Sequence, residues 1–222
     1  MITYKIYFIR HGLTEGNEEG RYIGSTDLPL SKEGEKDLIE LKEAFEYPDV
    51  QKVYTSPLQR CLDTAEILYP DRLIHIVNNL REYDFGAFEG KSLDELKDSD
   101  AFKKWAQSGM KSVPEGAEDM SAFIKRCEEG IEEVINDMMK NKVHTASVIT
   151  HGGVITNLLS MYGYPKREPL YWSVESGHGY TALLTTQLWQ RDKVFEVFDP
   201  LPYNDDFNDD MGYEIFDLEE SE

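Results

Sequence analysis

Apolar and polar positions along the chain predict strands and helices in alternation. Tyr4–Arg10 is a mostly apolar run rich in strand-forming residues, which is typical of a strand buried in a sheet. After Ser31, the side chains of Leu38, Leu41 and Phe45 recur at helical spacing and predict a helix. Strands that alternate with helices favour a three-layer α/β fold, in which a mostly parallel sheet carries helices on both faces.

The other segments extend this pattern to a six-stranded sheet. Beyond the first strand, we expect strands at residues 52–55, 73–77, 145–150, 180–186 and 194–198. The last two form a closing hairpin with a turn at residues 189–192. Further helices are expected at residues 56–68, 101–107, 120–138 and 152–161. Ser56 is the predicted N-cap of the first of these, because Pro57 and Gln59 complete the signals of a helix start.

The charge of the chain is concentrated at its end. The 43 acidic and 23 basic residues give a formal net charge of -20, and residues 199–222 contain ten of the acids and no Lys or Arg. We therefore expect a single domain over residues 1–198, in which residues 82–143 include a helical, lid-like insertion, and an acidic tail at residues 199–222. Aromatic and aliphatic residues between the acids of the tail predict that it packs on the domain or on a neighbouring subunit.

Composition also limits the partners and the compartment. A strongly negative surface repels nucleic acid and anionic membranes, so neither is expected to bind. A signal peptide and an apolar run of about 20 residues are both lacking, which predicts a cytoplasmic protein. Cys61 and Cys127 have no metal-ligand spacing and are expected to be free thiols. The composition is compatible with a homodimer.

Three residues that are distant in sequence fall at the carboxyl ends of predicted strands. His11 follows the first strand, His151 follows residues 145–150, and Arg60 lies just beyond residues 52–55. Ligands gather at this edge of parallel sheets, so we expect these side chains to form one site. Taken singly, each also has a structural interpretation, as a hydrogen-bonded histidine or a surface ion-pair partner.

Several blocks of the sequence resemble, in order, the signatures of the histidine phosphatase superfamily, also called the phosphoglycerate mutase-like family. The blocks are IRHGLTEGN at residues 9–17, GRYIG at 20–24, DLPLS at 27–31, SPLQRCLDTA at 56–65, LREYDFGAFEG at 80–90 and THGG at 150–153. The resemblance implies a phosphoglycerate mutase-like fold and a histidine phosphatase domain over residues 1–198.

The resemblance also implies roles for particular residues. His11 would be the nucleophile that forms a phosphohistidine, and Glu82 would protonate the leaving oxygen and later help to activate water. Arg10, Arg60 and a protonated His151 would hold the transferred phosphoryl group. The substrate-binding candidates are Asn17, Gly12, Thr14 and Arg21.

The residue types suit this chemistry. The planar fork of arginine binds two phosphate oxygens and stays charged. Guanidinium groups beside His11 push its imidazole toward the neutral form, which is the nucleophile. A carboxyl group such as Glu82 beside a bound dianion keeps its proton available for the leaving oxygen. Two displacements at His11 require no metal and no cofactor, so none is expected.

The predicted function is hydrolysis of small phosphorylated metabolites, and three alternatives remain beside it. The block at residues 82–90 resembles the phosphatase branch, but a cofactor-dependent phosphoglycerate mutase uses the same residue types. Lys103, Lys104 and Lys111 are then candidates for binding a second anionic group. A metal-dependent hydrolase would use His11 and His151 as ligands, although guanidinium groups would repel the cation. The third alternative is a non-catalytic binding module on the same fold.

Overall fold

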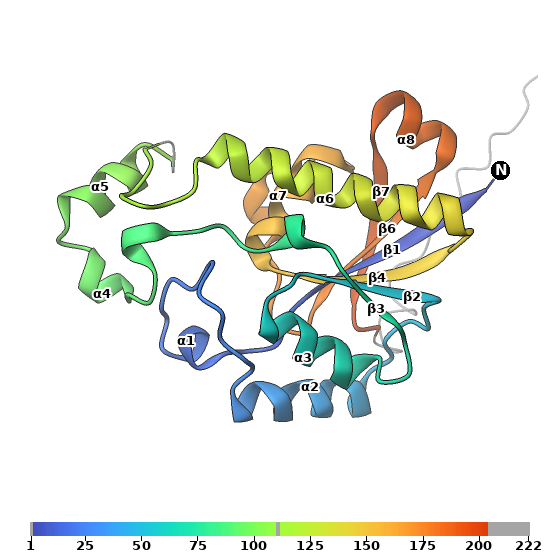
Figure 1. Ribbon diagram of the computed structural model, residues 1–222, viewed down its shortest axis with the longest axis horizontal. Coiled ribbons are helices and arrows are strands. Elements are labelled where there is room, and N and C mark those ends of the chain that lie inside the picture. Colours follow the sequence, from blue (N-terminus) through green and yellow to red (C-terminus); the bar gives the residue numbers. More distant parts are fainter. Residues whose placement is uncertain (1, 110–111, 204–222) are drawn as a thin grey trace, which may run out of the picture.

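The computed structural model describes residues 2–109 and 112–203, which form a seven-stranded sheet. The strands are β1 (Thr3–Arg10), β2 (Lys52–Thr55), β3 (Ile74–Ile76), β4 (Thr145–Thr150), β5 (Gly163–Tyr164), β6 (Gly179–Thr185) and β7 (Phe195–Leu201). Their order in the sheet is β3-β2-β4-β1-β6-β7-β5 (Figure 1). β3, β2, β4 and β1 are parallel, β6 is antiparallel to both of its neighbours, and β5 is parallel to β7.

This confirms the α/β class with a mostly parallel sheet, with one strand more than the six predicted. The additional strand, β5, has two residues and directly follows a helix, so it has no periodicity that a sequence could reveal.

Helices cover both faces of the sheet (Figure 1). α2 (Lys32–Ala44) and α3 (Gln59–Leu68) lie on one face, and α6 (Met120–Asn141) and α7 (Gly152–Tyr162) lie on the other. The shorter helices are α1 (Glu15–Glu18), α4 (Leu93–Leu96), α5 (Asp100–Gln107), α8 (Thr186–Asp192), and the 3-10 turns η1 (Asn78–Leu80), η2 (Gly86–Phe88) and η3 (Pro169–Trp172).

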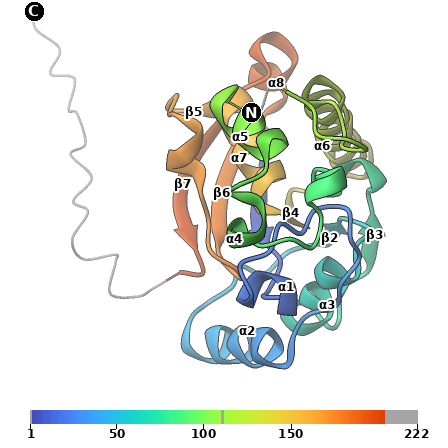
Figure 2. The same cartoon turned by 90° about the vertical axis from the view of Figure 1, so that its left-hand side faces the viewer.

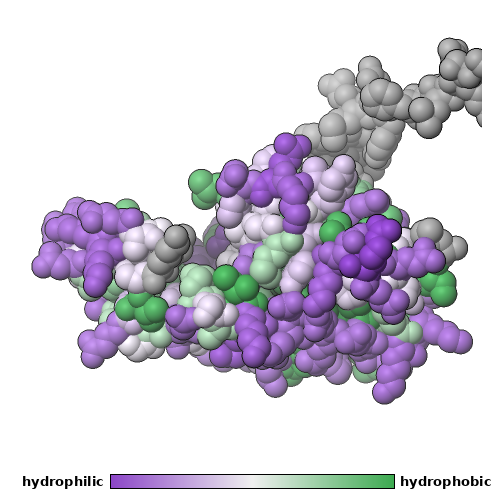
Figure 3. Space-filling model, turned by 90° about the horizontal axis from the view of Figure 1, so that it is seen from above, coloured by the Kyte–Doolittle hydropathy of each residue, from purple (hydrophilic) through white to green (hydrophobic). Residues whose placement is uncertain are grey.

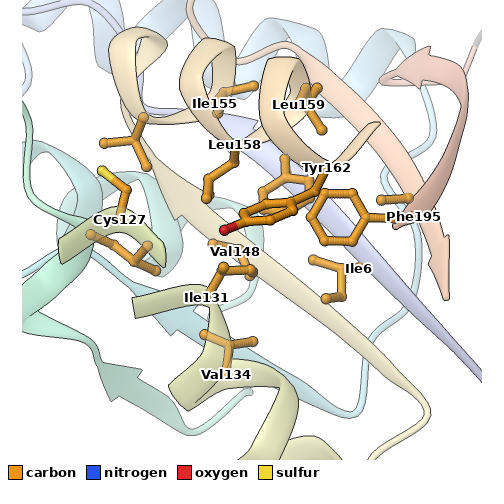
Figure 4. Close-up of a cluster of buried hydrophobic side chains, with 14 of the residues drawn as sticks. Ile6, Cys127, Ile131, Val134, Val148, Ile155, Leu158, Leu159, Tyr162 and Phe195 are labelled. Atoms are coloured by element: carbon orange, nitrogen blue, oxygen red, sulfur yellow. The ribbon is translucent and has the colours of Figure 1, made fainter. Parts of the chain in front are cut away.

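β1 separates two hydrophobic clusters, because its alternate side chains point to opposite faces. Ile6 and Phe8 belong to the cluster under α6 and α7, whereas Tyr7 and Ile9 belong to the one under α2 and α3. Figure 4 shows the first cluster, in which Val148 and Ile6 of the sheet lie below α7. Burial on both faces holds the end of β1, and therefore His11, in a fixed place.

The segment between residues 82 and 118 builds a small core of its own. Phe88, Leu96, Phe102 and Trp105 are buried against one another, and Tyr22 packs against them. α4 and α5 stand at one end of the molecule, nearest the viewer in Figure 2. The aromatic residues of this segment therefore hold α4 and α5 together.

The predicted start of α3 is wrong. The helix begins at Gln59, and its N-cap residue, Leu58, provides no side-chain cap. The N–H of Gln59 donates instead to Asp27 Oδ1 at 2.7 Å. Ser56 Oγ is bound to His151 Nε2 at 2.7 Å, so the side chain that was expected to cap the helix is used by the site.

The predicted turn at residues 189–192 is also wrong, because these residues belong to α8. Thr185 Oγ1 caps this helix by accepting from the N–H of Leu188. Trp189 is buried and stacks on Phe195, with 5.4 Å between ring centroids. The buried indole packs α8 against β7, so these residues form a packed helix and not a simple turn between the two strands. β6 and β7 do pair in antiparallel fashion, as predicted.

The C-terminal part of the described chain is joined to the body. β7 continues to Leu201, which is fully buried, and Tyr203 forms two backbone hydrogen bonds with Glu46. The rest of the expected tail, residues 204–222, lies outside the described residues, as does its predicted packing. Seen from above, the surface is mainly hydrophilic (Figure 3). Within residues 2–109 and 112–203, no helix is long and apolar enough to cross a bilayer.

Candidate active site

The pairing of β1 with β4 brings the two histidines of the RHG and THGG segments together. The two strands are parallel, with Arg10 in register with Thr150. His11 and His151 follow directly, and their ring centroids are 5.1 Å apart. Both side chains are buried. The sequence-based expectation that these strand ends converge is met.

Two hydrogen bonds define the state of the His11 imidazole. Nδ1 lies 2.6 Å from the carbonyl oxygen of Gly12, which can only accept, so Nδ1 carries the proton. Arg60 Nε donates to His11 Nε2 at 3.2 Å, so Nε2 presents its lone pair. Burial lowers the pKa of His11 well below 6.5, and the charges of Arg60 and Arg10 lower it further. His11 is therefore neutral at pH 7, with Nε2 as the nucleophilic atom.

Arg60 is held against His11 by the backbone of another loop. Besides its bond to His11, Arg60 donates from Nη1 to the carbonyl of Thr26 at 2.9 Å and from Nη2 to that of Gly24 at 2.7 Å. The side chain is 1% exposed, and burial lowers its pKa, although a guanidinium stays charged. These contacts use three of the five N–H groups that an arginine carries.

The carboxylate of Glu89 orders the loop that holds Arg60. It accepts from the N–H groups of Gly24 and Ser25 at 3.1 and 3.0 Å, and from Thr26 N–H and Oγ1 at 3.3 and 2.6 Å. One peptide group thus joins the two charges: its Ser25 N–H faces Glu89 and its Gly24 carbonyl faces Arg60. Residue 24 must be glycine, since a Cβ there would lie 1.8 Å from the carbonyl oxygen of Tyr83.

Arg10 reaches the same site from the end of β1. Its Nη1 donates to the carbonyl of Val174 at 2.8 Å, while its Nε is buried without a hydrogen-bond partner among the described residues. Burial lowers the pKa of Arg10, and the Glu82 carboxylate raises it. A buried, unpaired donor on a cation is suited to bind an anion.

The groups of the protein favour the neutral form of His151, whereas the proton predicted on it belongs to a site that holds a phosphoryl group. Burial lowers the pKa of His151 well below 6.5, and the charge of Arg60 lowers it further. Its Nε2 lies 2.7 Å from Ser56 Oγ. The groups of the protein alone thus leave His151 uncharged, because two arginines stand close to it and no carboxylate is paired with it within the part of the chain that the structure describes.

Glu82 is the buried acid of the site. Burial raises its pKa, while hydrogen bonds from two backbone N–H groups and the charges of Arg60 and Arg10 lower it; the net shift is upward. Tyr83 N–H donates to Oε1 at 2.8 Å, and Gly153 N–H, in the first turn of α7, donates to Oε2 at 2.9 Å. The upward shift favours the protonated carboxyl group, which is the form that can donate a proton.

The structure uses the substrate-binding candidates in different ways. Thr14 and Asn17 form the capping box of α1, in which Thr14 N–H donates to Asn17 Oδ1 at 3.2 Å. Gly12 N–H donates to Thr64 Oγ1, and a Cβ on Gly12 would lie 2.5 Å from Leu38. These three residues shape the loop after His11. Arg21 instead forms ion pairs with two glutamates, Glu19 and Glu95.

A cleft of about 880 Å³ leads to this loop. It passes between α2 and the loop before β6, and its lining includes Arg10, Gly12, Asn17 and Arg21. Arg10 borders this cleft, whereas His11, Arg60, Glu82 and His151 are buried and do not line it. The residues described here contain no group of three His, Cys, Asp or Glu side chains placed to hold a metal ion.

Three residues of the site were missed from the sequence. Ser56 binds His151, Glu89 orders the loop around Arg60, and Arg126 contacts the backbone of Glu82. A signal existed for the last one: Arg126 is a basic residue on the apolar face of the helix predicted at residues 120–138, next to Cys127. A charge in that position requires partners in the core.

Comparison with known proteins places the chain among both phosphatases and mutases. An adenosylcobalamin/alpha-ribazole phosphatase of Salmonella typhimurium is 26% identical over 178 residues, which cover 78% of this chain and 87% of that protein. The crystal structure of a phosphoglycerate mutase from Thermus thermophilus has a TM-score of 0.64 at 29% identity and covers 90% of this chain and 99% of its own.

A second solved structure supports the fold alone. The crystal structure of a phosphoglycerate mutase from Bacillus anthracis has a TM-score of 0.74 at 22% identity and covers 89% of this chain and 92% of its own. The histidine phosphatase superfamily (branch 1) matches residues 6–193, which is most of the chain. The chain therefore belongs to branch 1 of the histidine phosphatase superfamily.

Proposed function

We propose that this protein hydrolyses phosphate monoesters of small metabolites through a phosphohistidine at His11. The observation that carries the proposal is the state of His11: a neutral imidazole, protonated at Nδ1, whose Nε2 lone pair lies beside the guanidinium of Arg60. A nucleophile with a cation next to its attacking atom suits a phosphoryl group, whose charge is spread over its oxygens.

In the first step, His11 Nε2 attacks phosphorus and the bond from phosphorus to the ester oxygen breaks. Arg60 releases its contact with Nε2 and binds phosphate oxygens with its free N–H groups, while the unpaired Nε of Arg10 binds another. Glu82 gives its proton to the departing alkoxide, which leaves as an alcohol. A bound dianion also raises the pKa of His151, so that it becomes a further donor.

In the second step, water attacks the phosphohistidine. Glu82, now a carboxylate, removes a proton from the water as its oxygen bonds to phosphorus. The bond from phosphorus to Nε2 breaks, inorganic phosphate leaves, and His11 regains its neutral form. Glu82 regains its proton, so the site returns to its starting state.

The charges around the cleft favour hydrolysis over the mutase reaction. A mutase must hold a second anionic group, and the cleft presents the acids Asp37, Glu40 and Glu175. Arg21 is neutralised by its ion pairs with Glu19 and Glu95.

The lysines considered for this role give it little support. Lys103 donates to the backbone carbonyl of Asp98, and Lys104 is exposed on α5. Lys111 lies outside the described residues.

The test is to trap the covalent intermediate. Rapid quenching of the protein with 32P-labelled p-nitrophenyl phosphate should give an acid-labile, base-stable label in the wild type and none in His11→Ala. His75→Ala is the matched control, because His75 lies on β3 and pairs with Glu133 on the surface. Turnover by His11→Ala above about one hundredth of the wild-type rate would contradict the assignment.

Product analysis separates the hydrolase from the mutase. A panel that includes α-ribazole phosphate, sugar phosphates and 3-phosphoglycerate should release inorganic phosphate. Conversion of 3-phosphoglycerate to its isomer, faster than phosphate release from any ester of the panel, would replace the proposal by the mutase reaction. EDTA should leave kcat unchanged, because Arg10 and Arg60 supply the positive charge.

A further inference from the structure

We propose that Arg126 is a positioning residue that holds Glu82 where it can protonate the leaving oxygen, a role that rests on the proposed function of Glu82. Arg126 lies on α6 and is 7% exposed. Its Nη2 donates to the backbone carbonyl of Glu82 at 2.8 Å, and its Nη1 donates to those of Asn79 and Arg81 at 3.0 and 2.5 Å. One side chain thus binds three carbonyls of the segment that ends in the acid.

The carboxylate of Glu118 orients Arg126. Arg126 Nε donates to Glu118 Oε1 at 2.6 Å, and Nη2 donates to Oε2 at 2.7 Å. With the three carbonyls, these bonds use all five N–H groups of the guanidinium. The planar fork leaves Arg126 little freedom, so the three carbonyls are held in a fixed arrangement.

Glu82 requires such support because it lies in irregular backbone. Residues 81–85 follow η1 and precede η2 and belong to no helix or strand. Gly153 N–H fixes the carboxyl group, but it fixes neither the Cα of Glu82 nor the direction of its side chain. Arg126 holds the backbone of the same residue, so that Glu82 is held at both ends. Proton transfer depends steeply on such placement.

The ion pair of Arg126 with Glu118 also lies where stability alone would favour apolar side chains. Phe123, Cys127 and Ile131 on the same helix are buried in the main cluster, and Arg126 lies among them. A buried ion pair stabilises a fold little, since desolvation offsets the attraction, and apolar residues of similar volume often do as well. Arg126 therefore adds what apolar residues cannot provide, which is directed hydrogen bonds to the backbone of Glu82.

A role in protonation has a specific signature in the leaving group. A p-nitrophenolate leaves without a proton, whereas an alkoxide does not. Misplacing Glu82 should therefore slow alkyl esters more than aryl esters, whereas general loosening of the fold slows both alike. Glu82→Gln sets the scale, with a selective loss of about 10²–10⁴-fold in kcat/KM on the alkyl ester, because kcat/KM covers only the first displacement and not the later attack of water.

The variant to measure is Arg126→Lys, which keeps the charge beside Glu118 but cannot reproduce the five bonds. With β-glycerol phosphate and p-nitrophenyl phosphate as substrates, we expect kcat/KM on the alkyl ester to fall about tenfold more than kcat/KM on the aryl ester. The matched control is Asp137→Asn, which breaks an ion pair of the same helix with Lys52, on another element. It should lower Tm without leaving-group selectivity.

Each outcome either supports or overturns the proposed role of Arg126. Selectivity in both Glu82→Gln and Arg126→Lys supports the proposal. Selectivity in Glu82→Gln with equal losses for both esters in folded Arg126→Lys overturns it and leaves the function of Glu82 intact. Absence of selectivity in Glu82→Gln, or of a phosphohistidine in the wild type, removes the proposed function and this inference with it. If Arg126→Lys fails to fold, Glu118→Gln, which loosens the orientation of Arg126, must show the same selectivity, or the inference is wrong.

Discussion

The two sides of the site are built by different means. On the phosphate side, His11 and His151 directly follow β1 and β4, and Arg60 lies in the first turn of α3, so regular elements place all three. On the leaving-group side, Glu82 lies in irregular backbone and depends on contacts from α6 and α7. The sheet positions the first group through its hydrogen-bond register, whereas a network of side chains positions the second. Substitutions should therefore affect the two sides differently.

Burial has a similar electrostatic effect on both sides of the site. Burial drives both His11 and Glu82 toward their neutral forms: it lowers the pKa of the imidazole and raises that of the carboxyl. The two arginines favour neutral His11 but oppose protonated Glu82. A neutral base beside a protonated acid is the pair that the first step requires.

The largest expected effect tests the leaving-group side. Glu82→Gln should lower kcat/KM on β-glycerol phosphate about 10³-fold and change kcat/KM on p-nitrophenyl phosphate much less, because kcat/KM reports the first displacement, in which only the alkoxide needs a proton. Steady-state kinetics on both esters measure this. Asp84→Asn is the matched control, since Asp84 Oδ1 accepts from Gly86 N–H in the adjacent turn. A selective loss in Asp84→Asn in place of Glu82→Gln would identify Asp84 as the acid.

Arg60→Lys tests the phosphate side. It should lower kcat about 10²-fold on both esters, because a lysine cannot bind two phosphate oxygens and the loop carbonyls together. Arg72→Lys is the control, since Arg72 is paired with Asp49 on the surface. Near-normal turnover in Arg60→Lys, or a loss confined to the alkyl ester, would show that Arg60 does not act on the phosphate side.

Glu89→Gln should give a smaller loss of the same kind. Replacing the carboxylate weakens the loop that holds Arg60, and we expect kcat to fall about tenfold on both esters. If Glu89 acts through Arg60, the double variant with Arg60→Lys should be no slower than Arg60→Lys alone. Additive losses would show that Glu89 acts elsewhere. Glu95→Gln, in the exposed pair with Arg21, serves as control.

The smallest effect is a change in pH dependence. The acid must be protonated, so kcat/KM on the alkyl ester should fall as pH rises through the raised pKa of Glu82 in the free enzyme. The nucleophile must be neutral. The acidic limb of the pH profile should therefore lie well below pH 6.5, because the pKa of His11 is lowered well below this value. Profiles of kcat/KM against pH on both esters measure this. An alkaline limb that persists in Glu82→Gln would assign that limb to another group.

The phosphate side of the site could be predicted from the sequence pattern, whereas the leaving-group side could not. The apolar run of β1 and the strand before THGG were sufficient to predict that both histidines lie at one edge of the sheet. Glu82 was assigned by resemblance, because nothing in its local pattern indicates burial. The local sequence around Ser56 predicts a helix cap, whereas its bond to His151, far along the chain, leaves no local trace.

The sequence by itself determined the alternation of strands and helices, the family signatures, and the placement of His11, Arg60 and His151 at strand ends, because these follow from local periodicity and short motifs. The tertiary structure alone decided the tautomer of His11, the direction of the pKa shifts, and the supports of Arg60 and Glu82. The supports of Arg60 and Glu82 are hydrogen bonds between residues 34 to 71 positions apart, such as Arg60 with Thr26 and Glu82 with Gly153, and the pKa shifts arise mainly from burial. Such pairs meet only when the layers pack, so no window of the sequence contains both partners.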